Sequence, residues 1–223
     1  MREMAMSGLR RAYAMLTGQR LDSSGDYWQK RYERGETSGS GSYGRLAEFK
    51  ADVLNAIVAE RSVTTVIEFG CGDGAQLSMM RYPSYLGVDV SPAAVEVCRK
   101  KFAGDATKSF MTLDDFHRTR PAAALGLSLD VVYHLVEDTV FDRYMRDLFE
   151  SAQRWVAIYS SNSDRIIDPA PHVRHREFTR WIEQHAPDWQ LVKTYRNPYP
   201  HRWWNRKNTS PCDLFLFERI PGQ

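Results

Sequence analysis

Cysteine is scarce in this 223-residue sequence, and long apolar runs are missing. The three cysteines, Cys71, Cys98 and Cys212, are far apart and form no CxxC pair, which excludes a disulfide framework and a cysteine-based zinc site. We therefore expect a reduced, cytoplasmic chain. No stretch approaches the roughly 18 uninterrupted apolar residues that a membrane span needs, so the sequence predicts no integral membrane segment.

The sequence also lacks a large excess of charges of one sign. The chain has 30 basic and 28 acidic residues, for a net charge of +2. This balance argues against a protein that coats nucleic acid, because such proteins are strongly basic. The hydrophobic share of 43% and the charged share of 26% are those of an ordinary globular domain. The sequence therefore predicts no nucleic-acid partner.

The N-terminal segment, residues 1–20, contains arginines but no continuous apolar core and no small-residue cleavage site. We therefore do not interpret it as a signal peptide. Its apolar positions suit an amphipathic helix, which leaves two interpretations open: an arm for packing or homodimer formation, and a helix that binds a membrane surface. We expect residues 1–61 to form an arm and a helical cap over a cofactor, and residues 62–223 to form one compact domain.

Strand-like apolar runs alternate with helical patterns along most of the chain. The strand-like runs are residues 65–69, 85–89, 109–113, 123–129, 155–159, 189–193 and 213–217, and the helical patterns are 46–58, 75–81, 93–102, 141–151 and 178–185. Such alternation predicts an α/β fold with parallel strands joined by right-handed crossovers. No helix separates the last two strands, so the last strand is expected to be reversed. The expected sheet has seven mostly parallel strands with helices on both faces.

The sharpest local signal is a glycine-rich turn that reads E-F-G-C-G-D-G over residues 68–74. Its glycines allow a tight turn and the close approach of a ligand. Asp89 ends the next strand, where a carboxylate can accept hydrogen bonds from both ribose hydroxyls. Glu68, just before the first glycine, suits a cationic ligand such as an amine or sulfonium better than a pyrophosphate. The pattern predicts a nucleoside-type cofactor that carries a positive charge.

These motifs resemble those of the class I S-adenosylmethionine-dependent methyltransferases. Residues 68–74 are similar to the first motif of that family, and residues 87–91, G-V-D-V-S, to its second. The resemblance covers about residue 62 to the C-terminus and implies a Rossmann-like fold with S-adenosyl-L-methionine as cofactor. It implies that the acid after the third strand, Asp114 or Asp115, meets the adenine, and the sequence does not choose between them. Arg45 in the cap is a candidate for the cofactor carboxylate.

The resemblance assigns the remaining cofactor contacts by position. The methionine part would lie along the glycine turn, and the ribose would lie at the end of the second strand. The candidate residues are Glu68, Gly70, Cys71, Gly72 and Gly74 for the methionine part, and Asp89 and Val90 for the ribose.

Catalytic candidates follow the fourth strand, where ligands bind in open α/β sheets. Asp130 and His134 are four residues apart, and a neutral histidine with a pKa near 6.5 is the usual base for removing a hydroxyl proton. Two other interpretations of His134 stay open: a hydrogen-bonded packing histidine and an adenine contact. Asp130, His134 and Asp138 can also be read as ligands of Mg²⁺, which would lower the pKa of the acceptor.

Two loops supply candidate walls for the acceptor. Residues 164–176 and 197–211 place aromatic rings beside hydrogen-bond donors, a mixture that suits a carbohydrate. The candidate residues are His172, Arg174, His175, Tyr199, Trp203 and Trp204, with His172 and His175 as alternative bases. The N/D-P-P-Y/F motif of many amino-group methyltransferases is missing after the fourth strand, and the N-P-Y-P at 197–200 follows the sixth strand instead.

The combination of the cap, S-S-N-S at residues 160–163 and H-V-R-H at residues 172–175 is loosely similar to small bacterial glycan methyltransferases, such as the sugar O-methyltransferases of mycobacterial methylmannose polysaccharide assembly. This similarity favours a small-molecule or oligosaccharide acceptor. The leading hypothesis is therefore an S-adenosylmethionine-dependent O-methyltransferase of polysaccharide biosynthesis. Two alternatives stay open. One is a methyltransferase for another small molecule, such as a phenol, amine or carboxylate, and the other is a cofactor-binding scaffold without turnover.

Overall fold

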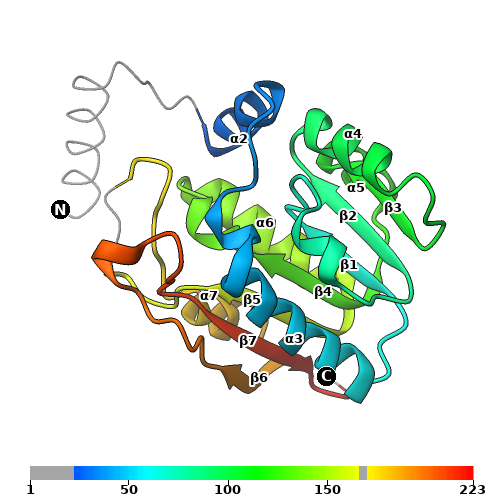
Figure 1. Cartoon of the computed structure of the whole chain (residues 1–223). Helices are drawn as coiled ribbons and strands as arrows, with labels where there is room; N and C mark the ends of the chain where they lie inside the picture. Colours follow the sequence, from blue (N-terminus) through cyan, green and yellow to red (C-terminus); the bar gives the residue numbers. More distant parts are fainter. Residues whose placement is uncertain (1–22, 166–169, 223) are drawn as a thin grey trace.

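The computed structural model describes residues 23–165 and 170–222, so the arm expected at residues 1–20 lies outside the described residues. The core of the molecule is a seven-stranded sheet in the order β3-β2-β1-β4-β5-β7-β6 (Figure 1). The strands are β1 (Val66–Phe69), β2 (Tyr85–Asp89), β3 (Lys108–Thr112), β4 (Ala123–Leu129), β5 (Ala152–Ser160), β6 (Trp189–Tyr195) and β7 (Asp213–Arg219).

The pairing of the strands confirms the expected topology. Strands β3, β2, β1, β4 and β5 pair in parallel, whereas β7 is antiparallel to both β5 and β6. The reversal follows from the chain connection: β6 and β7 are joined by a loop without an α-helical crossover, and a parallel pair would need a crossover. The sheet is therefore mostly parallel with a reversed last strand.

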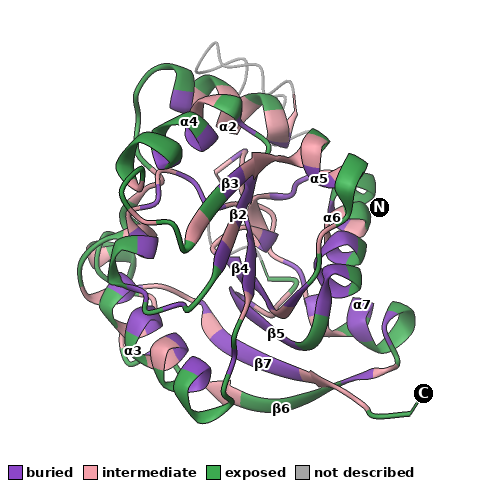
Figure 2. Ribbon diagram, turned by 90° about the vertical axis from the view of Figure 1, so that its right-hand side faces the viewer, coloured by how far each residue is buried: buried purple, intermediate pink, exposed green. Residues whose placement is uncertain are grey.

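Helices cover both faces of the sheet, as Figure 2 shows. One face carries α3 (Gly44–Glu60) and α4 (Pro92–Lys101), and the other carries α5 (Leu113–Thr119), α6 (Asp138–Ser151) and α7 (Phe178–His185). Successive side chains of a strand point to opposite faces, so the neighbours Val66 and Ile67 belong to different hydrophobic cores. Helix α3 buries Leu54 and Ile57 in the first core and is thus part of the body of the domain.

Two local elements differ from the sequence-based expectation. The helix expected at residues 75–81 is a single 3-10 turn, η2 (Gln76–Met79), because the short connection between β1 and β2 must also hold the glycine turn. Helix α5 was not expected. It begins at the N-cap Thr112, whose hydroxyl accepts the N–H of Asp115 at 3.2 Å, and its short apolar face buries Phe116.

Within the residues expected to form the cap, the chain folds into helix α2 (Ser24–Glu33), followed by an irregular segment with the short turn η1 (Ser40–Ser42). We call this segment the cap. Helix α2 lies at the carboxyl edge of the parallel strands (Figure 1). The hydroxyl and N–H of Ser24 donate to the carboxylate of Glu137 at 2.5 and 3.0 Å. The N–H of Ser38 donates to Asp73 at 2.9 Å, and the N–H of Asp73 donates back to the Ser38 hydroxyl at 3.0 Å. These bonds hold the cap against the glycine turn on one side and the β4–α6 loop on the other.

Candidate active site

The cap, the glycine turn and the carboxyl ends of β1, β2 and β4 enclose a cavity of about 390 Å³. This is the position at which open α/β sheets bind their ligands. The cavity is rich in carboxylates and poorer in cations. Its carboxylate side chains are Glu68, Asp73, Asp89 and Asp130, and its basic side chains are Lys50, Arg143 and His134. A pocket with this surplus of acids fits a ligand that carries a positive charge.

The sequence led us to expect a tight turn at the glycines, and the structure shows that its backbone is left-handed at all three. The φ angles of Gly70, Gly72 and Gly74 are 84°, 56° and 66°, a region that L-residues with a side chain rarely adopt. A Cβ atom at Gly72 would lie 2.3 Å from the Ser38 hydroxyl and 2.6 Å from the Tyr32 hydroxyl. Gly72 is therefore needed for two reasons, the turn itself and the close approach of the cap.

Asp89 is buried at the end of β2 and lines the cavity. Its Oδ2 accepts the N–H of Gly72 and its Oδ1 accepts the N–H of Ser91, both at 2.9 Å. Burial raises the pKa of this carboxyl, and the backbone donors act in the opposite direction. These donors orient the carboxylate, and its two oxygens have about four acceptor sites in all, so Asp89 can still accept a bond from a ligand. The next residue, Val90, lines the same cavity.

Replacing Asp89 by alanine is expected to weaken cofactor binding by about 2–3 kcal/mol, the scale of hydrogen bonds to a charged group. The variant loses the acceptor and also the restraint on the Gly72 N–H. Calorimetric titration with S-adenosylhomocysteine measures the change, and Asp105→Ala, an exposed acid at a distant turn, is the control. An unchanged affinity in Asp89→Ala would show that the ribose site lies elsewhere.

Glu68 is buried on β1, where Tyr85 donates its hydroxyl at 2.6 Å. Burial raises the pKa of Glu68 to about 7, although the bond from Tyr85 and the charge of Lys50 act against that shift. A cation in the cavity would favour the ionised carboxylate. Glu68 is therefore placed to respond to a positively charged ligand, as expected from its position before the glycines.

The sequence analysis missed Lys50, the cation at the centre of the site. Lys50 lies on α3, is 1% exposed, lines the cavity and forms an ion pair with Asp130. Tyr133 donates its hydroxyl to the other oxygen of Asp130 at 2.8 Å, and the φ of Asp130 is 61°. Arg45, the predicted carboxylate partner, instead lies over the ring of Tyr199 at 4.7 Å. A lysine within the buried face of α3 was the available signal, because an interior lysine needs an acidic partner.

His134 faces the cavity from the short turn η3 (Val132–His134). Its Nδ1 lies 2.9 Å from the carbonyl oxygen of His172. In the neutral ring Nδ1 therefore donates, which leaves Nε2 as an acceptor. Burial lowers the pKa of His134 to about 4, so the expectation of an ordinary value near 6.5 was wrong. The imidazole is neutral throughout the physiological range.

This low pKa predicts an acid-sensitive fold. Below its ordinary pKa of 6.5, His134 takes up a proton in the unfolded chain but resists it in the folded chain until about pH 4. The free energy of unfolding should therefore fall as the pH is lowered from about 6.5 to about 4, by up to about 3 kcal/mol from this residue. Urea unfolding at several pH values measures the slope. The His134→Asn variant should lose this part of the slope, and an identical slope would contradict the assignment.

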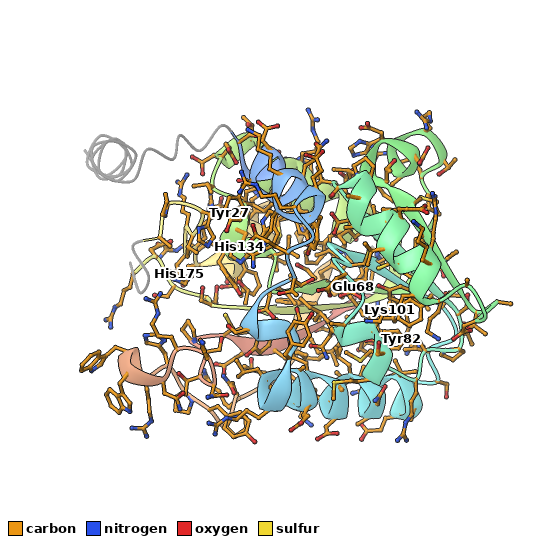
Figure 3. The ribbon with its side chains drawn as sticks, turned by 45° about the horizontal axis from the view of Figure 1, so that its top comes forward. Tyr27, Glu68, Tyr82, Lys101, His134 and His175 are labelled. Atoms are coloured by element: carbon orange, nitrogen blue, oxygen red, sulfur yellow. The ribbon has the colours of Figure 1, made fainter. Side chains whose placement is uncertain are left out.

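The loop at residues 170–176 packs against this histidine. The ring of His172 stacks between Tyr27 at 4.7 Å and His134 at 5.5 Å. His175 has its Nδ1 2.6 Å from the hydroxyl of Ser161, and its ring stacks on Tyr133. Figure 3 shows Tyr27, His134 and His175 near one another, with Glu68 deeper in the molecule. The predicted histidines of this loop are thus brought to the catalytic candidate.

The candidate magnesium ligands are not brought together. The carboxylate of Asp138 binds Arg174 at 3.0 Å and Arg176 at 2.9 Å, while Asp130 binds Lys50. Within residues 23–165 and 170–222, no group of three or more His, Cys, Asp or Glu residues is placed to hold a metal ion. The expectation of a site at Asp130, His134 and Asp138 was wrong, because arginine and lysine already neutralise the two acids.

The remaining candidates lie at the margins of the cavity or outside it. Asp115 accepts the Thr112 hydroxyl at 2.8 Å and pairs with Arg118 in the first turn of α5, next to Asp114. It is their neighbour Leu113 that lines the cavity. Trp203 and Trp204, on η4 (Trp203–Asn205) in the β6–β7 loop, are 77% and 63% exposed. The adenine contact stays a prediction.

No protein-family model matches the sequence, and no curated protein matches it. Solved structures do match. The N-methyltransferase NodS from Bradyrhizobium japonicum WM9, in complex with S-adenosylhomocysteine, has a TM-score of 0.64 at 16% identity, covering 87% of this chain and 99% of that one. The chain has a methyltransferase fold. Magnesium protoporphyrin IX methyltransferase from Synechocystis PCC 6803 has a TM-score of 0.63 at 15% identity, covering 87% and 97%. The methyltransferase domain of bacterial CtHen1-C has a TM-score of 0.60 at 17% identity, covering 77% and 97%.

Proposed function

We propose that the chain is an S-adenosyl-L-methionine-dependent methyltransferase. The observation that carries this proposal is the Asp89 carboxylate, which is oriented by the N–H of Gly72 at the edge of an acidic cavity. NodS and the protoporphyrin methyltransferase, which share the fold, were solved with S-adenosylhomocysteine bound. The residues present fit such a group, since a ribose needs an acceptor and a sulfonium favours nearby acids.

Each part of the cofactor has a partner in the cavity. Asp89 would accept the ribose hydroxyls, and the glycine turn would lie along the methionine part. Lys50 would lie near the carboxylate of the methionine part, and Glu68 near the positive charges. S-adenosylmethionine, when bound, supplies a methyl group activated by its sulfonium. The role of the cap is to cover this site and exclude water, which strengthens the charge interactions inside.

We further propose that the acceptor is a hydroxyl of a saccharide or glycan precursor. His134 supports this, because its Nε2 is an acceptor while its Nδ1 is held by the His172 carbonyl. A hydroxyl must lose its proton during methyl transfer, and a positioned neutral histidine can take it. Asp130 would orient the site through Tyr133 and Lys50. His172, Arg174 and His175 supply polar groups beside this end.

A phenol is the second candidate acceptor. The indole of Trp28 meets His134 edge to face at 4.9 Å, and Trp28 and Tyr32 both line the cavity from α2. These rings would pack against an aromatic acceptor as readily as against the C–H face of a sugar. Amines and carboxylates are further alternatives that use the same cofactor site.

An acceptor panel tests the proposal. The chain is incubated with methyl-labelled S-adenosylmethionine and saccharides, phenols, amines or carboxylates, and labelled product and S-adenosylhomocysteine are measured together. Transfer to saccharides above the level of the other classes supports the full proposal. Transfer to another class alone would retain the methyltransferase and replace the acceptor. Cofactor binding without any transfer would favour the scaffold alternative.

A further inference from the structure

The β6–β7 loop carries the two most exposed large apolar side chains of the described residues. Trp203 is 77% exposed and Trp204 is 63% exposed, and their rings meet edge to face with centroids 5.6 Å apart. A single exposed apolar residue is ordinary, but two adjacent indoles form a patch with a large apolar area. An exposed apolar patch of this kind indicates a surface that binds another molecule or a membrane.

Hydrogen bonds within the loop fix the backbone that carries these indoles. The side-chain amide of Asn197 donates to the carbonyls of Tyr199 and Ser210, both at 3.1 Å, and the Ser210 N–H donates to Tyr199 at 3.0 Å. The hydroxyl of Thr209 donates to the carbonyl of Asn205 at 2.7 Å. Asn197 and Thr209 are buried. The indoles are thus presented by a hydrogen-bonded stem.

The charge around the indoles is of one sign. Residues 196–212 contain four Lys or Arg residues and no Asp or Glu. Arg202, Arg206 and Lys207 are exposed, and the guanidinium of Arg202 lies 5.5 Å from the ring centroid of Trp204. Indoles favour the headgroup level of a bilayer, and each Lys or Arg near an anionic lipid surface strengthens the attachment. Two adjacent indoles with Lys and Arg residues beside them in the same loop match the chemistry of an anionic bilayer surface.

The loop lies at the edge of the sheet that carries the cavity. Asp213, at the start of β7, pairs with Ser160 at the carboxyl end of β5. Tyr199 contacts Arg45, which lies in the first turn of α3 close to the cap. A partner that binds the loop would therefore lie at the same edge of the molecule as the cap.

We propose that the β6–β7 loop docks the chain on anionic membrane surfaces, with Trp203 and Trp204 inserted at the headgroup level and Arg202, Arg206 and Lys207 facing the lipid phosphates. Within residues 23–165 and 170–222, none of the helices has the length and hydrophobicity of a membrane-spanning segment. The docking proposal concerns contact with the lipid surface. It does not depend on the methyl-transfer proposal, because lipid binding can be measured without cofactor or acceptor.

The test is co-sedimentation of the full chain with vesicles of phosphatidylcholine alone and of phosphatidylcholine mixed with phosphatidylglycerol. The chain should bind the anionic vesicles, bind the neutral ones weakly, and dissociate as salt is raised. The double variant Trp203→Ala/Trp204→Ala should bind anionic vesicles at least about tenfold more weakly. Leu191→Ala, which removes an exposed apolar side chain of β6, is the matched control and should bind like the unmodified chain.

Equal vesicle binding by the double variant and the unmodified chain would overturn the proposal, with circular dichroism verifying that both are folded. Binding that ignores the lipid charge would overturn the role of the cations. Single-stranded RNA provides the last comparison. RNA binding that needs both indoles, without vesicle binding, would identify a nucleic-acid surface instead and would also overturn the proposal.

Discussion

Substituting valine for Gly72 is expected to lower the affinity for S-adenosylmethionine about a hundredfold or more. The new side chain would have to adopt φ near 56° and would meet the hydroxyls of Ser38 and Tyr32. Backbone strain and overpacking cost roughly 1–3 kcal/mol each. The turn or the cap must shift to relieve them, and either shift disturbs the N–H that holds Asp89. Calorimetric titration with the cofactor measures the loss.

Gly104→Val is the matched control. Gly104 is exposed, and a Cβ atom there would have nothing within 4 Å. This variant should bind the cofactor like the unmodified chain. Thermal unfolding should show a cooperative transition for both variants. Retained affinity in a folded Gly72→Val protein would mean that the cofactor does not lie along this turn.

Removing the imidazole of His134 is expected to reduce methyl transfer about 10²–10⁴-fold while leaving cofactor affinity within a few-fold. The reason is the acceptor at Nε2, which is available because Nδ1 donates to the His172 carbonyl. Single-turnover transfer by His134→Ala at saturating cofactor measures the effect. Because burial lowers the pKa of His134 to about 4, its contribution should persist as the pH is lowered from about 8 to about 5.

His185→Ala is the control, since this exposed histidine on α7 stacks on Trp181 outside the cavity. It should transfer methyl at the normal rate. The variants His172→Ala and His175→Ala separate the alternatives. A near-normal rate in His134→Ala, with a collapse in one of these two, would assign the base to the loop at residues 170–176.

The fold and the glycine turn could be predicted from the sequence because their signals are local. Alternating apolar runs specify strands and helices, and the glycines with Asp89 specify a turn whose geometry depends on a few adjacent residues. The final strand was predicted as reversed for the same reason, since a loop without a helix favours an antiparallel neighbour. Helix α5 escaped prediction because it is short and its apolar face amounts to little more than Phe116.

The catalytic end of the site was harder to predict from the sequence because it is assembled from segments that are far apart in the chain. Lys50 and Asp130 are separated by 80 residues, and nothing local at either position indicates the ion pair. The pKa of His134 likewise depends on burial beneath the cap and beside His172, which no spacing reveals. The metal expectation failed for the same reason, as Arg174 and Arg176 reach Asp138 from another loop.

Titration of the unmodified chain with S-adenosylhomocysteine tests the central claim most directly, because this ligand probes the cofactor site without any acceptor. Binding should be saturable with one site per chain, should weaken by about 2–3 kcal/mol in Asp89→Ala, and should be unaffected in Gly104→Val. No saturable binding by the folded, unmodified chain would contradict the assignment of this cavity as a methyltransferase cofactor site.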